Sequence, residues 1–338
     1  MKAARLYGVR DLRVEEVPDP VPGPGDLLIK IKACGVCPSD LRAYQGTRAS
    51  GSTEPRTPGH EWSGIVAGLG EGVTDFQIGD RVVPDWRVVC GKCFNCRRGV
   101  FNYCTNLGLI RGGFAEMGVA PATNVRRIPS AVSFEQAAFC EPLACCLNGS
   151  QACRIGLGDD VAIVGCGPIG LQHLQLARFQ GARIIAIDLD EQRLAMAAKL
   201  GAHDLVKSGP DAPDPIARVR ELTEGRGVDA AIVAVGSTVA VKQAMAMAGL
   251  NGRVQIFAGT YPSQEMPVDP NIIHYGQLNV TGSHDFTPHH FTTALKLITL
   301  GTVDVISLIS HRFPLAETRE ALETTATRRG LKAMVYMD

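Results

Sequence analysis

The chain has 338 residues, a length that suits two domains, and its 34 Lys and Arg residues balance 34 Asp and Glu residues. With 45% hydrophobic residues and no stripe of basic and aromatic residues, this composition argues against nucleic-acid binding. The N-terminus lacks the apolar core of a secretory signal, and no apolar run approaches the ~20 residues that span a bilayer, so we expect a cytoplasmic protein without membrane contact.

The first 150 residues have the composition of an irregular β domain. The runs DLLIKIKACGV and EWSGIVAGLG predict strands, and VPDPVPGPGD predicts a loop because it is rich in Pro and Gly. Loops on a β scaffold commonly carry functional residues. We therefore expect the reactive side chains of this half to lie between its strands.

Four cysteines follow in one short segment with the spacing C-x2-C-x2-C-x7-C. Four thiolates this close can close a tetrahedral zinc site, which leaves no position for a substrate. A set of surface thiols is the alternative. The chain has 11 cysteines and no export signal, which favours reduced thiols and metal ligands over disulfides. The predicted ligands are Cys90, Cys93, Cys96 and Cys104.

From about residue 155 the pattern changes to alternating strands and helices. DVAIVG, RIIAID, DAAIVAVG and RVQIFAG are buried-strand runs, and helical segments separate them. This alternation predicts βαβ units and a parallel sheet. A further helix is predicted at residues 287–301, with Thr287 as N-cap and Pro288 in its first turn. We interpret His289 and His290 in this helix as surface or interface residues.

A glycine pattern, G-x-G-x-x-G, joins the first of these strands to its helix. Gly165 allows a tight turn, Gly167 lets the backbone approach a pyrophosphate, and Gly170 permits close packing of helix on strand. Alone the pattern indicates only a glycine-rich turn. Asp188 at the end of the next strand would accept hydrogen bonds from ribose hydroxyls and favours NAD over NADP. Arg193 leaves NADP open, because an arginine can bind a 2′-phosphate.

An open metal site needs other ligands than the four cysteines. Cys37 in ACGVCPSD, His60 and Glu61 in PGHEWSG, and Glu141 in CEPLACC are candidates by residue type. Each also has an ordinary structural interpretation: a core thiol, a loop histidine, and an acid at the start of a helix. Spacing alone does not unite them.

Taken together, the motifs resemble the zinc-containing medium-chain dehydrogenase/reductase family, and within it the sorbitol-like polyol branch. The resemblance covers essentially the whole chain, in order, through CGVCPSD, GHEWSG, GDRVVPD, the four-cysteine lobe, GGFAEM, CEPLA, GCGPIG and DLDEQRL. It implies an α/β protein with a GroES-like β-rich catalytic domain (1–150, lobe about 86–108). A doubly wound Rossmann NAD-binding domain (151–286) and a C-terminal return to the catalytic domain (287–338) complete it.

The resemblance also implies a role for individual residues. Cys37 and His60 would hold a catalytic zinc, with Glu61 or Glu141 as a further ligand, and the four-cysteine lobe would hold a structural zinc, so two zinc ions per chain. Ser39 would pass the substrate proton outward. The further residues that the resemblance implies for support and cofactor contact are Asp40, Pro168, Ile169, Arg193, Ser283 and His284.

The expected activity is hydride transfer from a secondary alcohol (a polyol, sugar alcohol or cyclitol) to NAD. An amino alcohol such as threonine or an aminocyclitol is the alternative substrate. A non-catalytic nucleotide-binding relic is the alternative of another class, suggested by Arg42, which stands where many relatives have a relay histidine and cannot act as a base. The short link TNLGLIRGG suits a bulky or cyclic substrate. The family habit predicts a homo-oligomer, dimer or tetramer.

Overall fold

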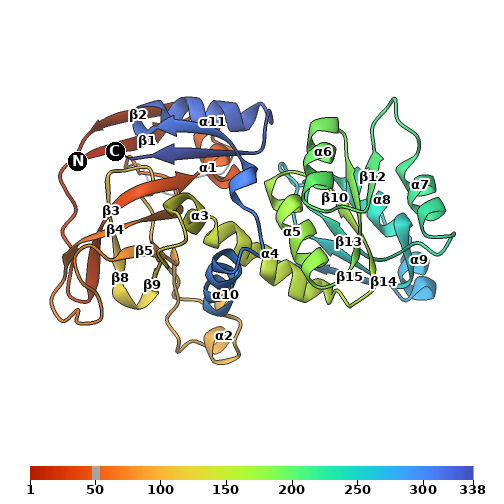
Figure 1. Ribbon diagram of the computed structural model, residues 1–338, viewed down its shortest axis with the longest axis horizontal. Coiled ribbons are helices and arrows are strands. Elements are labelled where there is room, and N and C mark those ends of the chain that lie inside the picture. The colour runs from red at the N-terminus through yellow and green to blue at the C-terminus, as the bar shows by residue number, and fades with distance from the viewer. Residues whose placement is uncertain (48–53, 338) are drawn as a thin grey trace. The chain divides into compact units, whose positions relative to one another are not determined.

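The computed structural model describes residues 1–47 and 54–337. The chain forms two compact units (Figure 1). Unit 1 comprises Met1–Ala144, Thr287–Gly301 and Val305–Asp338, and unit 2 comprises Cys145–Phe286 and Thr302–Asp304. The first division between them falls inside helix α4 (Cys140–Cys153). This 14-residue helix, CEPLACCLNGSQAC, therefore contributes residues to both units.

Unit 1 is built on a seven-stranded sheet, in the order β16-β17-β3-β4-β5-β9, with β8 also paired to β3. Both strands predicted in this half are confirmed, as β3 (Asp26–Gly35) and β4 (Glu61–Leu69). The other strands of the sheet are β5 (Arg81–Pro84), β8 (Met117–Pro121), β9 (Val125–Arg127), β16 (Ile309–Pro314) and β17 (Lys332–Tyr336).

The register of β3 against β4 prepares the site. The two strands are antiparallel, and Gly35 at the end of β3 lies opposite Glu61 at the start of β4. Trp62, next along β4, is 1% exposed and packs in the core with Ile29 and Ile31 of β3. Burial of these apolar side chains holds the strand ends in place, so residues just after β3 and just before β4 come together.

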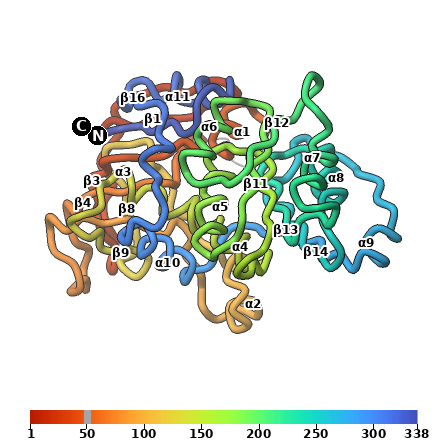
Figure 2. Tube along the Cα trace, turned by 45° about the vertical axis from the view of Figure 1, so that its right-hand side comes forward, coloured from red at the N-terminus to blue at the C-terminus, as the bar shows by residue number. Residues whose placement is uncertain are grey.

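The end of the chain returns to this sheet. β17 pairs antiparallel with β3, Met334 opposite Gly35, and parallel with β16. In Figure 2 the blue segment with β16 and α11 lies beside the red segment with β1. The remaining elements of unit 1 are β1 (Lys2–Gly8), β2 (Asp11–Glu16), α1 (Pro38–Tyr44), β6 (Arg87–Val88), α2 (Phe94–Arg97), η1 (Phe101–Tyr103), β7 (Gly108–Leu109), η2 (Ala122–Asn124), α3 (Phe134–Ala138), α10 (Pro288–Thr299), η3 (Ile306–Leu308), η4 (Leu315–Glu317) and α11 (Thr318–Ala326).

Unit 2 contains a six-stranded sheet in the order β12-β11-β10-β13-β14-β15, and every neighbouring pair is parallel. The predicted doubly wound parallel sheet is thus confirmed. Its strands are β10 (Asp160–Val164), β11 (Arg183–Asp188), β12 (Asp204–Lys207), β13 (Val228–Val233), β14 (Ala248–Ile256) and β15 (Asn279–Gly282). The helices are α5 (Pro168–Phe179), α6 (Glu191–Lys199), α7 (Pro215–Leu222), α8 (Thr238–Met247) and α9 (Pro270–Gly276).

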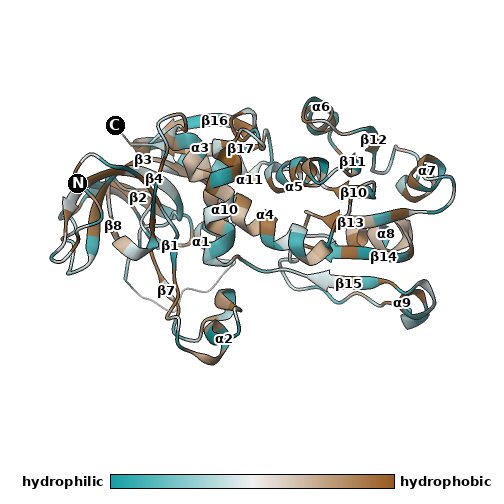
Figure 3. Ribbon diagram, turned by 60° about the horizontal axis from the view of Figure 1, so that its bottom comes forward, coloured by the Kyte–Doolittle hydropathy of each residue, from teal (hydrophilic) through white to brown (hydrophobic). Residues whose placement is uncertain are grey.

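Helix α7 is amphipathic, as expected for a helix with one face on a sheet and the other in solvent. Figure 3 shows hydrophilic and hydrophobic colours side by side on α7, where Val219 is buried and Arg218 is exposed. The predicted helix at 287–301 is confirmed as α10 with Thr287 as N-cap. The interpretation of His290 as a surface residue is wrong: it is 8% exposed, and its Nδ1 lies 3.2 Å from the Thr287 N–H, in a capping box. Among the described residues, no helix has the length and apolar character to cross a bilayer.

Candidate functional site

Cys37 occupies the N-cap of α1, directly after β3. Asp40, in the first turn of that helix, accepts a hydrogen bond from the Cys37 N–H at 3.1 Å. This local contact orients the turn so that the Cys37 thiol is held where β3 ends. Ser39 is half-buried one residue before Asp40, and Arg42 is half-buried in the last turn of the same helix. The CPSD motif therefore places its thiol at the N-cap and its hydroxyl in the first turn of one short helix.

His60 lies just before β4, and Asp40 supports it. The His60 Nδ1 is 3.6 Å from Asp40 Oδ1, which also accepts the Gly59 N–H at 3.2 Å. Burial alone would lower the pKa of His60, but the negative charges of Asp40 and Cys37 outweigh burial and raise this pKa well above its ordinary value. The carboxylate thus fixes the imidazole ring and leaves Nε2 for a partner on the other side.

Glu61 follows on β4 and is 2% exposed. Its Oε2 forms an ion pair with Lys332 of β17, which is 6% exposed. Burial alone would lower the pKa of Lys332, but the negative charges of Glu61 and Cys37 outweigh burial and raise this pKa. The pair needs the space beside Gly35, because a Cβ there would lie 2.2 Å from Glu61 Oε2. A buried lysine with a charge partner holds one oxygen of Glu61 and leaves the other available.

Glu141 approaches His60 from the start of α4. Its Oε1 lies 3.9 Å from His60 Nε2, and its side chain is buried. Burial raises the pKa of Glu141 to about 7, because the positive charge of His60 only partly offsets the loss of water. The Trp86 indole N–H also interacts with Glu141 and lowers its pKa, although this contact lies outside hydrogen-bond geometry.

These side chains converge on one point in unit 1. The ligand atoms of Cys37, His60 and Glu61 all lie within 4.8 Å of one another, and Glu141 lies on the Nε2 side of His60. One sulfur, one imidazole nitrogen and carboxylate oxygens are the donors that zinc binds in catalytic sites, which keep one position open. The donor set therefore fits the metal ion that the sequence suggests, with Glu61 and Glu141 both close enough to His60 to serve.

Two residues of this site escaped the sequence prediction. The Trp86 ring packs on His60, with centroids 4.8 Å apart and planes at 43°. Lys332 reaches Glu61 only because β17 pairs with β3. Trp86 follows the GDRVVPD motif directly, so its position next to a recognised segment was the one available signal. Lys332 gave none, since it stands at the start of an apolar strand far from any motif.

The four cysteines form a separate cluster in unit 1, and their sulfur atoms lie within 4.8 Å of one another. Backbone N–H groups of the lobe itself support the sulfurs: Cys93 N–H contacts Cys90 Sγ at 3.4 Å, and Cys90 N–H contacts Cys104 Sγ at 3.3 Å. The backbone N–H groups of Cys96 and Thr105 lower the pKa of Cys93 to about 5. Four sulfurs with a stabilised thiolate among them fit a closed tetrahedral zinc site.

In unit 2 the glycine loop has the geometry that the sequence reasoning required. Gly165 has φ +97°, a left-handed conformation that favours glycine. A Cβ on Gly170 would lie 1.8 Å from the Gly165 carbonyl oxygen, so only glycine fits. A Cβ on Gly167 would meet nothing closer than Arg193 Nη1 at 3.9 Å, which leaves room for a phosphate in front of α5. Pro168 begins the helix, and Ile169 follows half-buried.

Asp188 ends β11 beside this loop. Its Oδ2 accepts the Cys166 N–H at 2.6 Å and its Oδ1 accepts the Asp190 N–H at 2.9 Å. Each carboxylate oxygen keeps a lone pair for a further donor, such as a ribose hydroxyl. By contrast, the Ser283 hydroxyl accepts a hydrogen bond from Gln255 Nε2 at 2.7 Å within the unit. His284 is exposed, and its backbone carbonyl accepts from Asn148.

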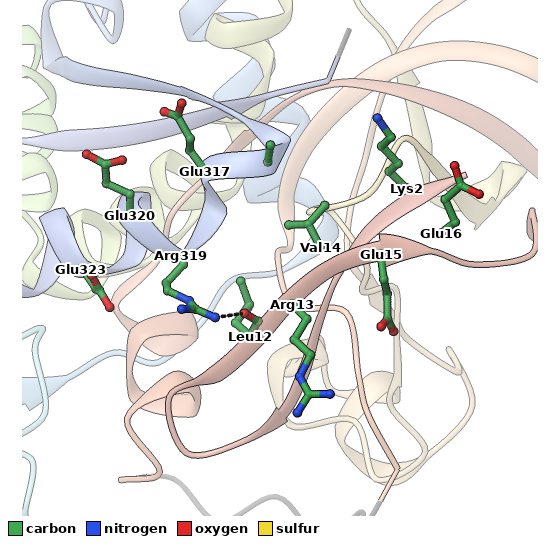
Figure 4. Close-up of a pocket in the computed structure, with 11 residues that line it drawn as sticks. Lys2, Leu12, Arg13, Val14, Glu15, Glu16, Glu317, Arg319, Glu320 and Glu323 are labelled. Atoms are coloured by element: carbon green, nitrogen blue, oxygen red, sulfur yellow. Dashed lines mark hydrogen bonds between the residues drawn. The ribbon is translucent and has the colours of Figure 1, made fainter.

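A groove of unit 1 lies elsewhere and lacks this chemistry. It has a volume of about 930 Å³ and lies between β1, β2 and the η4–α11 segment (Figure 4). Its lining contains neither Cys nor His. Arg319 crosses it to donate to the Leu12 carbonyl at 2.8 Å, and Tyr44 donates to Glu323 at 2.9 Å. Arg319 and Glu323 of this groove thus make contacts within unit 1, and the groove brings together no thiol or imidazole donor.

Comparison with known proteins adds relatives to this geometry. Residues 23–130 match the alcohol dehydrogenase GroES-like domain, and residues 168–299 match the zinc-binding dehydrogenase domain. The chain is 30% identical to sorbitol dehydrogenase of Bacillus subtilis, covering 99% of this chain and 97% of that protein. It is 33% identical to erythritol/L-threitol dehydrogenase of Mycolicibacterium smegmatis, covering 97% and 94%.

The fold is also shared with solved structures. A structure from Sinorhizobium meliloti 1021 bound to NADP superposes with a TM-score of 0.91 at 35% identity, and covers 99% of this chain and 98% of that one. The GroES-like and Rossmann domains implied by the motifs are therefore confirmed.

Proposed function

The chain belongs to the zinc-containing alcohol dehydrogenase family, sorbitol-like branch, and on that premise we propose that it oxidises a secondary alcohol of a polyol, sugar alcohol or cyclitol with NAD. The observation that carries this proposal is the convergence of Cys37, His60 and Glu61 within 4.8 Å, with Glu141 beside them. A set of one thiol, one imidazole and carboxylates suits an alcohol-binding metal centre rather than a structural one.

In the proposed mechanism, Cys37 and His60 would hold the catalytic zinc together with Glu61 or Glu141. When bound, this ion supplies a Lewis acid that lowers the pKa of the substrate hydroxyl. Asp40 keeps the His60 ring in place through its Nδ1. Ser39 Oγ receives the proton that the hydroxyl loses.

The proton then has to leave without a relay histidine. Arg42 stands on the same helix α1 and keeps its charge, so it cannot carry the proton further. We propose that the proton passes from Ser39 to a cofactor ribose hydroxyl or to solvent. The positive charge of Arg42 favours an anionic group, of cofactor or substrate, close to this helix.

The cofactor is proposed to bind in unit 2 at the glycine loop. The N–H groups at the start of α5 would face the pyrophosphate, and Asp188 would accept the ribose hydroxyls. Arg193, near Gly167, would contact the adenosine side. The acidic Asp188 supports NAD, since a carboxylate repels a 2′-phosphate. The NADP in the Sinorhizobium relative makes NADP the direct competitor to test.

Trp86 supports a polyol or cyclitol as substrate. Its indole lies against His60, half-buried, so its face can pack on the C–H face of a sugar-like carbon chain. The Bacillus relative is named for sorbitol and the Mycolicibacterium relative for erythritol and L-threitol, which are polyols. Glu141, which is buried beside the site, provides a carboxylate that can accept hydrogen bonds from further hydroxyl groups.

The first experiment is formation of NADH, or of NADPH, with a panel of polyols, cyclitols, aminocyclitols and threonine. Each reaction is run with and without a zinc chelator. Turnover of the uncharged polyols with NAD, lost on chelation, is the expected result. A clear preference for amino alcohols would move the substrate class. Absence of turnover with every alcohol, while NAD still binds, would contradict the proposal and point to Arg42.

We further propose two zinc ions per chain, one at Cys37 and one in the four-cysteine lobe. Metal analysis of the purified protein tests this number. We also propose a cytoplasmic location, which is supported by the clustering of unpaired thiols in arrangements suited to metal rather than to disulfides. An export-dependent activity would contradict it.

We also propose that the chain assembles as a dimer or tetramer. β15 is an edge strand of the unit 2 sheet, and Val280 on it is 37% exposed. Exposed Ile272 and Tyr275 lie on the preceding helix α9. An unpaired strand edge with apolar side chains suits pairing with a second copy across a two-fold axis. Light scattering of the purified chain should give a multiple of its mass, and Val280→Lys should reduce it.

A further inference from the structure

A short segment joins the catalytic cluster to the four-cysteine lobe. Trp86 packs on His60, and the first lobe cysteine, Cys90, follows four residues later. Between them, β6 pairs with β7 on the other side of the lobe, and the Ile110 N–H donates to the Trp86 carbonyl at 2.7 Å. The backbone of Trp86 is therefore held by residues that enter and leave the lobe.

The turn that carries Trp86 is fixed on both sides. Asp85, 2% exposed, accepts the Arg87 N–H on its side chain at 3.0 Å, which closes a tight turn around Trp86. Asn124 donates from Nδ2 to the carbonyls of Asp85 and Arg87, at 3.2 and 2.8 Å. Its own carbonyl accepts the Asp85 N–H at 2.8 Å. These contacts hold the backbone around Trp86 in place, and this limits the movement of the indole ring.

Arg87 extends this arrangement into the lobe. It is only 4% exposed, and its Nη2 donates to the Asn102 carbonyl at 2.6 Å. Asn102 belongs to η1, which ends just before Cys104. The guanidinium also lies 5.7 Å from the centroid of the Trp86 ring. Burying a guanidinium is costly unless such partners compensate it, so its place depends on where the lobe holds Asn102.

We propose that Arg87 is a positioning residue that holds the Trp86 indole against His60 and makes this position depend on the folded four-cysteine lobe. The proposal rests on the proposed function in one respect, that Trp86 lines the alcohol site. The lobe then does more than stabilise its own loop. By fixing the Asn102 carbonyl, it fixes one wall of the site for the substrate.

The test uses Trp86 as its own reporter. The chain has 2 Trp residues, so Trp62→Phe leaves Trp86 as the single tryptophan. In this background, Arg87→Met keeps the apolar stem and removes the guanidinium. The matched control is Arg98→Met: Arg98 is an exposed arginine of the same lobe, over the Phe94 ring. Emission maximum, acrylamide quenching and circular dichroism are measured for all three proteins.

Arg87→Met is expected to shift Trp86 emission to the red and to make quenching faster, with Arg98→Met unchanged. Cys93→Ser, which opens the lobe, should produce the same change in emission. Arg87→Lys, which keeps one donor, covers the case in which Arg87→Met does not fold, and should give a smaller shift. Emission and quenching equal to the parent in folded Arg87→Met or Arg87→Lys overturn the proposal. The proposal is also overturned if Cys93→Ser shifts the emission of Trp86 and the Arg87 variants do not.

Kinetics separate positioning from simple damage. Arg87→Met should raise KM for the alcohol by about tenfold with kcat within about twofold, and leave KM for NAD unchanged. A purely structural defect would instead lower kcat through a smaller active fraction, at unchanged KM, and would overturn the positioning role. Failure of the proposed function looks different: no alcohol is turned over by the Trp62→Phe parent, while the emission change of Arg87→Met remains.

Discussion

The two metal-type clusters of unit 1 differ in where their donors come from. The lobe gathers four sulfurs from a single segment, Cys90 to Cys104. The cluster around His60 gathers one sulfur, one imidazole and carboxylates from the start of α1, from β4 and from α4. Around a zinc ion, four thiolates would complete a tetrahedron, whereas the mixed set would leave a position for an oxygen of the substrate. The type and origin of the donors thus support different proposed roles, a structural one for the lobe and a catalytic one for the cluster around His60.

Their supports differ in the same way. The lobe sulfurs are held by backbone N–H groups of the lobe, such as Cys96 N–H on Cys93 Sγ at 3.5 Å. The His60 cluster is held by charged side chains from other elements, Asp40 on one side and Lys332 on the other. The supports of the lobe cysteines come from the lobe itself, whereas the supports of the His60 cluster come from α1 and β17.

The largest effect is expected from Cys37→Ser, which tests the difference between the two clusters most directly. Loss of this sulfur ligand should lower turnover by at least ~10³-fold, because a bound Lewis acid would supply several kcal/mol of stabilisation to the reacting oxygen. Zinc content should fall by one per chain, and NAD binding to unit 2 should persist. Steady-state kinetics, metal analysis and NAD titration measure these effects.

Cys34→Ser is the matched control, since Cys34 is a buried thiol three residues away that lies outside the cluster. Its activity should stay within about threefold of the parent. Turnover retained by Cys37→Ser would remove Cys37 from the reactive cluster.

The lobe should respond differently to the same chemical change. Cys96→Ser removes one of four ligands of a closed site, so it should cost about 3 kcal/mol or more of stability and release the other zinc. Thermal denaturation followed by circular dichroism, with metal analysis, gives both numbers. Lys92→Ser, exposed in the same lobe, is the control and should leave both unchanged. Equal stability of Cys96→Ser and parent would show that no metal holds the lobe.

Local spacing explains which parts of the molecule could be predicted. The lobe and the glycine loop each occupy one continuous stretch, so the positions of Cys93 or Gly170 state their geometry directly. The parallel sheet followed from alternating strands and helices. His60 and Glu141 are 81 positions apart in sequence, and only the resemblance to a family connected them, because no local pattern encodes their 3.9 Å approach.

The parts that escaped prediction depend on long-range pairing. Lys332 meets Glu61 because β17 adds to β3 beside β4, a register that its own apolar sequence does not specify. Burial of His290 was missed because its N3 position in α10 offers a capping contact to Thr287 that a helical-wheel argument about metal ligands ignores. The packing of Trp86 on His60 could not be predicted, because only the folded structure shows that the segment after β5 reaches His60.

Lys332→Met sharpens the contrast in supports. It leaves Glu61 charged and buried without its partner, which should cost about 3 kcal/mol in the free energy of unfolding and also reduce turnover. Urea denaturation measures the loss. The double variant Lys332→Met with Glu61→Gln removes both charges and should recover most of the stability. Lys30→Met, an exposed lysine on β3, is the control. A Lys332→Met protein as stable as the parent would mean that the ion pair contributes nothing to the cluster.

The smallest effect is expected on the pH dependence of stability, and it comes from a second buried histidine, His173 of α5 in unit 2, which differs from His60 in its surroundings. His173 is 0% exposed, and neither ring nitrogen has a hydrogen-bond partner among the described residues; its ring packs edge-on against Phe257 at 4.6 Å. Burial lowers the pKa of His173 to about 3 from 6.5, the opposite direction to His60, which has Asp40 and Cys37 beside it. Charged neighbours, rather than burial, therefore decide which histidine can be a cation.

Because the unfolded chain binds this proton more readily than the folded one, stability falls as pH drops below 6.5 and continues to fall toward pH 3. Between pH 7 and pH 5 the His173 contribution should amount to about 2 kcal/mol. His173→Leu should reduce the pH dependence of the free energy of unfolding by this amount, measured in urea at pH 7, 6 and 5. His274→Gln, an exposed histidine of α9, should keep the parent's slope. An unchanged slope in His173→Leu would show that His173 finds a partner for its proton, as His60 does.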